Sequence, residues 1–201
     1  MMPGVKLRTI VWAGGLAAGA AAVGHAAMRT DEGPAVDREL FEALNRGHGE
    51  IPDRVFMGVT ELGALYAVGS AAGALAVLGR RRAALNAVAA AGATWVLGQG
   101  VKRLVDRPRP YEAGAETTRR MIAPPHGTSW PSSHPAVLTT FTRVAARELA
   151  LGAGARAALS GLDLSVAASR VYLGVHYPSD VASGLLMGRA VARIWPRWGR
   201  P

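Results

Sequence analysis

Cysteine is absent from the 201-residue sequence, which excludes a disulfide framework and any metal site built from thiolates. Aromatic side chains that could stack on bases are also scarce, with three phenylalanines, four tyrosines and five tryptophans. A net charge of +9 is often a sign of nucleic-acid binding. Here, however, the arginines cluster between apolar segments instead of alternating with aromatic residues. We therefore expect no nucleic-acid partner and attribute the basic character to membrane topology.

Hydrophobic residues make up half of the chain and are concentrated in long runs. A run of about 20 residues crosses a hydrocarbon core of about 30 Å as a helix. We predict six such spans, over residues 9–28, 55–79, 83–101, 133–151, 156–172 and 178–195. The many alanines suit close packing of helices in a membrane. The sequence therefore predicts an all-α, six-span transmembrane helical bundle that forms one membrane-embedded domain over residues 1–201.

The N-terminal region, residues 1–54, combines the first span with a polar stretch. Because Lys6 and Arg8 precede the apolar run, that run could also be a cleaved secretory signal. In the polar stretch 29–54, apolar residues recur at helical spacing: Val36, Leu40, Phe41 and Leu44. This pattern predicts a short amphipathic helix lying on the membrane surface, with its charged face in solvent.

The stretch from Arg170 to Asp180 sets His176 four residues ahead of a carboxylate. A neutral imidazole attacks through one ring nitrogen when the other nitrogen carries the proton, and a carboxylate on that proton fixes the tautomer. Asp180 can serve His176 in this way. The same spacing is also compatible with a simple helix cap beside a satisfied histidine.

Two other polar clusters lie at the edges of apolar segments. Lys102 and Arg109 are seven residues apart in the first cluster, and Pro131-Ser132-Ser133-His134 forms the second. If six spans alternate across the membrane, both clusters fall on the same side as His176. A single site requires this arrangement.

The three clusters read KxxxxxxRP, PSxH and SRxxxxxHxxxD in this order, from Lys102 to Asp180. This set resembles the three-part signature of the type 2 phosphatidic acid phosphatase superfamily. Three spaced patterns in the right order are far more specific than one motif. Ser133 departs from the family, which most often has glycine at this position, but the backbone N–H survives the change.

The resemblance implies hydrolysis of a phosphate monoester or diphosphate on a membrane lipid, without metal or cofactor. It implies His176 as the nucleophile that forms a phosphohistidine, Asp180 as its orienting partner, and His134 as the acid that protonates the leaving alkoxide. The implied phosphate-binding residues are Lys102, Arg109, Ser132, Ser133 and Arg170. Residues 55–195 would then form the catalytic core. Four further arginines are expected to form a solvated or headgroup-binding rim: Arg103, Arg107, Arg119 and Arg120.

Charge placement predicts the orientation, because short cytoplasmic loops carry an excess of lysine and arginine. Several basic groups fall on one side of an alternating bundle: Lys6 with Arg8, Arg80–Arg82, Arg147 with Arg156, and Arg193–Arg200, which includes the basic tail 196–201. That side is expected to be cytoplasmic, so a multi-pass protein of the cell membrane would carry its active site on the outer face.

The expected partners are a membrane lipid phosphate and the bilayer, and no obligate protein partner is evident. Two other functions fit the cationic cluster: a non-catalytic membrane protein that binds or moves phospholipids, and a vanadate-dependent peroxidase-like site.

Overall fold

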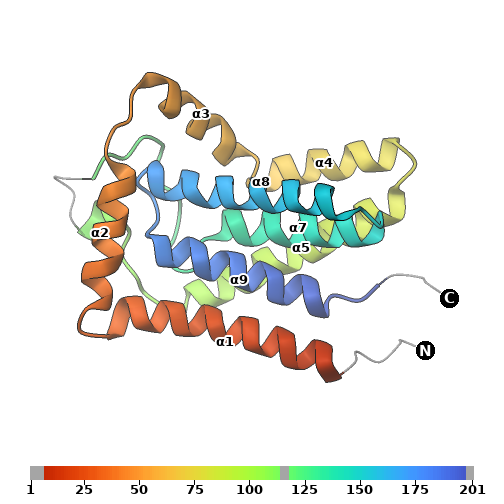
Figure 1. The fold of residues 1–201 in the computed structure, drawn as a ribbon, viewed down its shortest axis with the longest axis horizontal. Helices are drawn as coiled ribbons and strands as arrows, with labels where there is room; N and C mark the ends of the chain where they lie inside the picture. Colours follow the sequence, from red (N-terminus) through yellow and green to blue (C-terminus); the bar gives the residue numbers. More distant parts are fainter. Residues whose placement is uncertain (1–6, 114–117, 198–201) are drawn as a thin grey trace.

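The computed structural model describes residues 7–113 and 118–197, and within these ranges every regular element is a helix (Figure 1). This confirms the predicted all-α class. The helices are α1 (Leu7–Arg29), α2 (Gly33–Asn45), α3 (Glu50–Glu61), α4 (Leu65–Val77), α5 (Arg81–Lys102), α6 (Pro110–Ala113), α7 (Ser133–Glu148), α8 (Ala153–Tyr172) and α9 (Pro178–Ile194). Lys6 and most of the predicted basic tail lie outside the described residues.

The second predicted span is not one helix. It is divided between α3 and α4, which meet at an angle of 64° after Glu61. The break lies where Gly63 approaches two other helices, because a Cβ atom at this position would be 2.7 Å from Val166 of α8 and 3.0 Å from the Cβ of His134. The bend therefore allows the chain to pack closely beside the predicted site.

Hydropathy and length separate α1 from the other described helices. Among residues 7–113 and 118–197, α1 alone is both long and apolar enough to cross a membrane by itself, and the bent α3–α4 pair passes only when taken together. The other long helices carry polar residues at buried positions, such as Asn86 in α5 and Asp163 in α8. The six-span prediction is therefore not confirmed by this measure.

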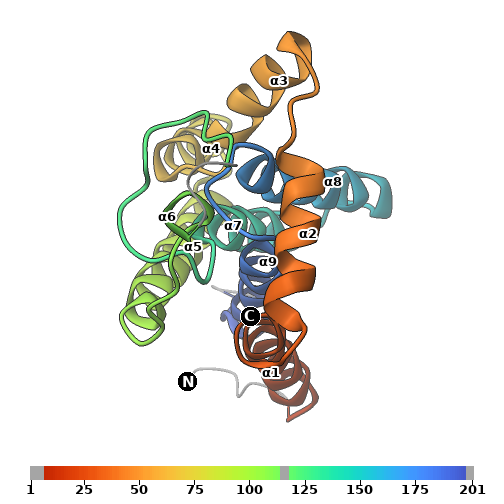
Figure 2. The same cartoon turned by 90° about the vertical axis from the view of Figure 1, so that its left-hand side faces the viewer.

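Helix α7 lies in the middle of the bundle and packs against α5, α8 and α9 (Figures 1 and 2). Small residues allow the close approach of α9, because a Cβ atom at Gly188 would be 2.5 Å from the carbonyl oxygen of Ala136. The hydroxyl groups of Thr94 in α5 and Thr140 in α7 hydrogen-bond at 2.9 Å. Small residues and short polar contacts of this kind are typical of helices packed in membranes.

Helix α2 crosses one end of the bundle, at the left of Figure 1, and its two faces differ from the prediction. The apolar residues Val36, Leu40 and Leu44 are exposed, whereas Asp37 and Asn45 are buried. The exposed apolar stripe agrees with a helix that lies on a membrane. The expectation of a fully solvated charged face is wrong, because α2 turns an acidic side chain toward the protein.

Candidate active site

The three sequence clusters meet at the end of the bundle that α2 crosses. The last turns of α5 and α8 and the first turns of α7 and α9 converge there, together with the long loop after α6 (Figure 2). Lys102 closes α5, His134 begins α7, Arg170 lies in the last turn of α8, and Asp180 lies in the first turn of α9. The predicted convergence of distant segments is thus present.

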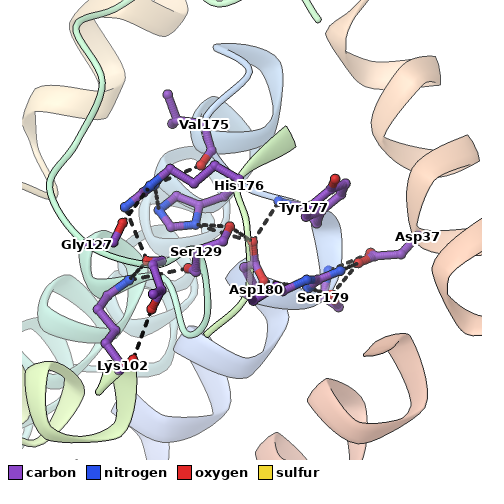
Figure 3. A network of polar contacts seen from close by, with 12 residues as sticks. Asp37, Lys102, Gly127, Ser129, Val175, His176, Tyr177, Ser179 and Asp180 are labelled. Atoms are coloured by element: carbon purple, nitrogen blue, oxygen red, sulfur yellow. Dashed lines mark hydrogen bonds and ion pairs between the residues drawn. The ribbon is translucent and has the colours of Figure 1, made fainter. Parts of the chain in front are cut away.

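His176 lies in the short loop between α8 and α9 and is 3% exposed. Its Nε2 atom is 3.3 Å from Nη1 of Arg109, and its Nδ1 atom is 3.4 Å from Oδ2 of Asp180 (Figure 3). Because a guanidinium can only donate, the Arg109 contact requires the lone pair on Nε2, and the proton then lies on Nδ1, facing the carboxylate. Burial lowers the pKa of His176 to about 3, so the ring is neutral at physiological pH.

Asp180 is fully buried and uses both oxygens. Its Oδ1 accepts a hydrogen bond from Nη1 of Arg107 at 2.6 Å, and its Oδ2 accepts from the Ser129 hydroxyl at 2.5 Å and from the Tyr177 N–H at 2.8 Å. The contact with Tyr177 caps the N-terminus of α9. Asp180 therefore caps α9 and also faces the proton on His176. The sequence offered a helix cap and an orienting partner of His176 as alternatives, and the same carboxylate occupies both positions.

Arg107 extends this network to α2. Its Nη2 donates to Oδ2 of Asp37 at 2.6 Å, and Ser179 donates to the same carboxylate from its backbone N–H at 2.9 Å and its hydroxyl at 2.5 Å. The guanidinium also lies 4.3 Å from the centre of the Tyr177 ring. The expectation that Arg107 belongs to a solvated rim is wrong, because it is 8% exposed and bridges two carboxylates.

Arg119 departs from the expected rim as well. Its guanidinium pairs with Asp53 of α3, and its backbone N–H donates to Oδ1 of Asn45 at 2.8 Å. Asn45 in turn donates to the carbonyl of Tyr172 at 2.8 Å. These contacts fasten the loop that follows α6 to α2, α3 and α8, so Arg119 serves tertiary structure. Arg103 and Arg120 are exposed, as expected.

Lys102 and Arg109 both hold the loop after α6 by its backbone carbonyls. Nζ of Lys102 donates to Thr128 O at 2.5 Å, and Arg109 donates to the carbonyls of Gly127 and Val175 at 3.0 and 2.9 Å (Figure 3). Burial, with the neighbouring charge of Arg109 acting in the same direction, lowers the pKa of Lys102 to about 8. Both cations thus bind backbone carbonyls of the loop, and Arg109 also contacts His176.

Several donors near the start of α7 have no partner within the described residues. The hydroxyl groups of Ser132 and Ser133 and the Nε of Arg170 are buried without a hydrogen bond. Arg170 uses only Nη1, which donates to Thr60 at 2.8 Å. The N-terminus of α7 also has no side-chain cap. Unpaired donors beside a helix N-terminus suit an anion.

His134 makes no hydrogen bond within the described part of the chain, but it lies within electrostatic range of the cations and of the other histidine: Arg170, His176, Arg109 and Lys102. It packs next to Gly63 at the α3–α4 break. Ser133 turns its hydroxyl toward Gly98 of α5, with 3.7 Å between Oγ and a Cβ atom built at that glycine. The serine in place of glycine therefore packs against a neighbouring helix.

Sequence reasoning missed two residues of the site, Asp37 and Ser129, and assigned a third, Arg107, to the rim. Arg107 lies in the recognised cluster, two residues before Arg109, and this closeness was the sequence signal that it could do more than belong to a rim. Asp37 and Ser129 carried no signal, because each belongs to a polar stretch and meets its partner only in the folded protein. Within residues 7–113 and 118–197, no group of three or more His, Asp or Glu side chains could hold a metal ion.

The sequence model of the PAP2 superfamily matches residues 82–201. A protein of Mycobacterium tuberculosis named decaprenylphosphoryl-5-phosphoribose phosphatase is 38% identical over 128 residues, which cover 61% of this chain and 64% of that protein. The Mycolicibacterium smegmatis protein of the same name is 37% identical over 115 residues, covering 57% of this chain and 59% of that protein. These matches thus span less than two thirds of either relative.

Two solved structures share the fold. The crystal structure of Aquifex aeolicus LpxE aligns with a TM-score of 0.67 at 26% identity, over 77% of this chain and 90% of that one. The transmembrane PAP2-type phosphatidylglycerolphosphate phosphatase of Bacillus subtilis aligns with a TM-score of 0.71 at 22% identity, over 92% of this chain and 90% of that one. The second match extends over nearly the whole chain, including the region before residue 82.

Proposed function

This chain belongs to the PAP2 superfamily, and from that membership and the geometry of the site we propose that it hydrolyses a lipid phosphate through a phosphohistidine on His176. The observation that carries the proposal is the buried neutral imidazole, with Nε2 facing Arg109 and Nδ1 facing Asp180. A helix cap alone would not need a second, unprotonated ring nitrogen directed at a cation.

In the first step, the lone pair of Nε2 forms a bond to phosphorus while the bond from phosphorus to the lipid oxygen breaks. His134 gives its proton to that oxygen, and Asp180 stabilises the positive ring of His176. In the second step, a water oxygen attacks phosphorus, the P–N bond breaks, and the proton of the water passes to His134. A dianionic phosphate among the cations favours the protonated form of His134 before the first step.

Phosphate binding is assigned to Lys102, Arg109, Ser132, Ser133 and Arg170. The assignment of Arg170 and Ser132 is supported by their unpaired buried donors, since a phosphate oxygen would satisfy them. Lys102 and Arg109 would exchange some carbonyl contacts for phosphate oxygens. Charge-assisted bonds of this type stabilise a transferring phosphoryl group more than the ground state.

The substrate is proposed to be a lipid because the outward faces of the bundle are apolar. Large hydrophobic side chains are exposed on separate helices, such as Ile10 of α1, Val96 of α5 and Leu164 of α8. We propose six crossings, formed by α1, the α3–α4 pair, α5, α7, α8 and α9. The α4–α5 connection, the start of α8 and the end of α9 lie at the end of the bundle away from the α8–α9 loop (Figure 1). These segments carry Arg80–Arg82, Arg156 and Arg193, which supports a non-cytoplasmic active site.

A cavity of about 680 Å³ adjoins the site and is suited to selecting the substrate. It lies between α6 and the loop that precedes α7, and its lining includes Arg107, Tyr111, Arg120, His126 and Thr128. Thr128 also accepts a hydrogen bond from Lys102, so a group bound in this cavity would be separated from the proposed phosphate-binding residues only by Thr128. The lining also includes the acidic residues Asp106 and Glu112, so it offers both hydrogen-bond donors and acceptors. A polar headgroup, such as the phosphoribose in the name of the mycobacterial relatives, fits this lining.

The test is an assay of purified protein in detergent with a chelator present. The panel comprises phosphatidic acid, phosphatidylglycerophosphate, undecaprenyl diphosphate and decaprenylphosphoryl-5-phosphoribose. We expect phosphate release from at least one lipid and a loss of at least about a thousandfold in His176→Ala. We also expect a phosphoryl group on His176 in wild-type protein that is quenched in denaturant and kept at alkaline pH, because the P–N bond is labile in acid. Unchanged release by His176→Ala would exclude the nucleophile. Lipid binding without release would favour a non-catalytic protein. Bromide oxidation with added vanadate and hydrogen peroxide would favour a peroxidase-like site.

A further inference from the structure

A second cavity, of about 790 Å³, lies at the end of the bundle away from His176. It is bounded by the C-terminal halves of α7 and α9 and the N-terminal half of α8, at the right of Figure 1. Six arginines line it against two carboxylates. None of these residues belongs to the three sequence clusters, so the catalytic site does not account for this concentration of charge.

One of the six arginines has a structural role. Arg147 donates through Nη1 to the carbonyls of Ala192 and Trp195, both at 3.1 Å, and thereby holds the C-terminus of α9. Its neighbour Glu148 accepts a hydrogen bond from Asn86 of α5 at 3.0 Å. These two residues are fastened to the bundle and do not explain the other charges.

Arg143 of α7 and Arg189 of α9 are different, because neither forms a hydrogen bond or an ion pair within residues 7–113 and 118–197. The Nε of Arg189 is buried without a partner. Both guanidinium groups lie within electrostatic range of each other and of Asp163, a carboxylate that is 2% exposed and accepts a hydrogen bond from Thr142 at 3.0 Å. Two cations beside one carboxylate leave a positive excess that an anion would neutralise.

We propose that this cavity binds the phosphate group of an anionic phospholipid, with Arg143 and Arg189 as its ligands. A lipid fits better than a free anion because the apolar residues Leu159 and Ile194 also line the cavity, and Ile194 is 44% exposed beside it. Basic pockets between helices at a membrane edge are suited to such headgroups. The lipid site is separate from the proposed catalytic site. The proposal does not depend on which side of the membrane this end of the bundle faces.

The experiment titrates short-chain phosphatidylglycerol into the full-length protein in an uncharged detergent and follows the temperature of unfolding. We expect phosphatidylglycerol to raise this temperature and phosphatidylcholine to leave it unchanged. Arg189→Gln, and more strongly Arg143→Gln with Arg189→Gln, should weaken the apparent affinity about tenfold or more, because a charge-assisted hydrogen bond is lost. Arg189→Lys should retain part of the effect, and Arg143→Gln alone serves if Arg189→Gln does not fold.

Two control variants separate this site from other charges. Arg54→Gln removes an exposed arginine that pairs with Glu50 on α3 and should bind phosphatidylglycerol like the wild type. Arg109→Gln impairs the catalytic site and should also keep the shift, so a failure of the proposed catalytic function would not affect this result. Equal binding of phosphatidylglycerol by the double variant would overturn the proposal. An equal shift with inorganic phosphate, lost in Arg189→Gln, would overturn the assignment to a lipid.

Discussion

Each end of the bundle is held together by an arginine that donates to backbone carbonyls. At one end Arg109 binds carbonyls of the loop before α7 and of Val175, and at the other end Arg147 binds carbonyls at the close of α9. Only Arg109 also reaches an imidazole, the Nε2 of His176 at 3.3 Å. An arginine that binds backbone carbonyls can thus have a purely structural role, as Arg147 does. The His176–Asp180 pair beside Arg109 is what makes the other end a candidate catalytic site.

Among the variants that test this comparison, the largest effect is expected from Arg109→Gln. The change removes a charge beside the proposed phosphate position, and loss of one donor to a developing oxyanion typically costs about a hundredfold to a thousandfold in turnover. Phosphate release from the preferred lipid, measured as kcat per folded molecule, tests this. Near-normal turnover would mean that Arg109, like Arg147, has only a structural role. The proposed difference between the two ends of the bundle would then be wrong.

A smaller loss is expected from Asp37→Asn. The new amide would present N–H groups to Arg107 and to the Ser179 hydroxyl, which both donate to this oxygen in the wild type. Arg107 would then hold Asp180 less firmly, and a small displacement of a catalytic group can cost about tenfold to a hundredfold.

The loss in Asp37→Asn should fall on kcat, with KM little changed, because Asp37 is a positioning residue. Glu39→Gln on the exposed face of the same helix is the matched control and should behave as wild type. If both variants lose the same activity, the effect comes from the charge of α2 and the proposed positioning role is wrong.

The pH dependence of kcat/KM provides the next test. Since burial lowers the pKa of Lys102 to about 8, the free enzyme carries this cation below that pH and loses it as the pH rises through it. We expect kcat/KM to fall above about pH 8 by up to about tenfold per pH unit. A guanidinium at the same position would stay charged over this range, so Lys102→Arg should move the fall to higher pH. Identical profiles would show that another group controls the alkaline limb.

The sequence predicted the helical class and the meeting of three clusters, because long apolar runs and ordered motifs are local signals. Its failures concern facts that depend on tertiary contacts. Asp37 looks like any acidic residue of an amphipathic helix until α2 crosses the bundle and places it against Arg107. The bend after Glu61 was not predicted because no proline interrupts residues 55–79, and the closeness of Val166 and His134 to Gly63 arises only in the folded protein.

The smallest effect on turnover is expected at the opposite end, from Arg147→Gln. This variant leaves the carbonyls of Ala192 and Trp195 without their donor, so the free energy of unfolding should fall by about 1–3 kcal/mol. Turnover per folded molecule should stay within about twofold, because the side-chain hydrogen bonds of Arg147 within the described residues all lie at its own end of the bundle. Chemical denaturation and the phosphatase assay on the same preparation separate the two quantities. A turnover loss as large as that of Arg109→Gln would show that the ends are coupled, and the arginine at the far end would then be more than scaffold.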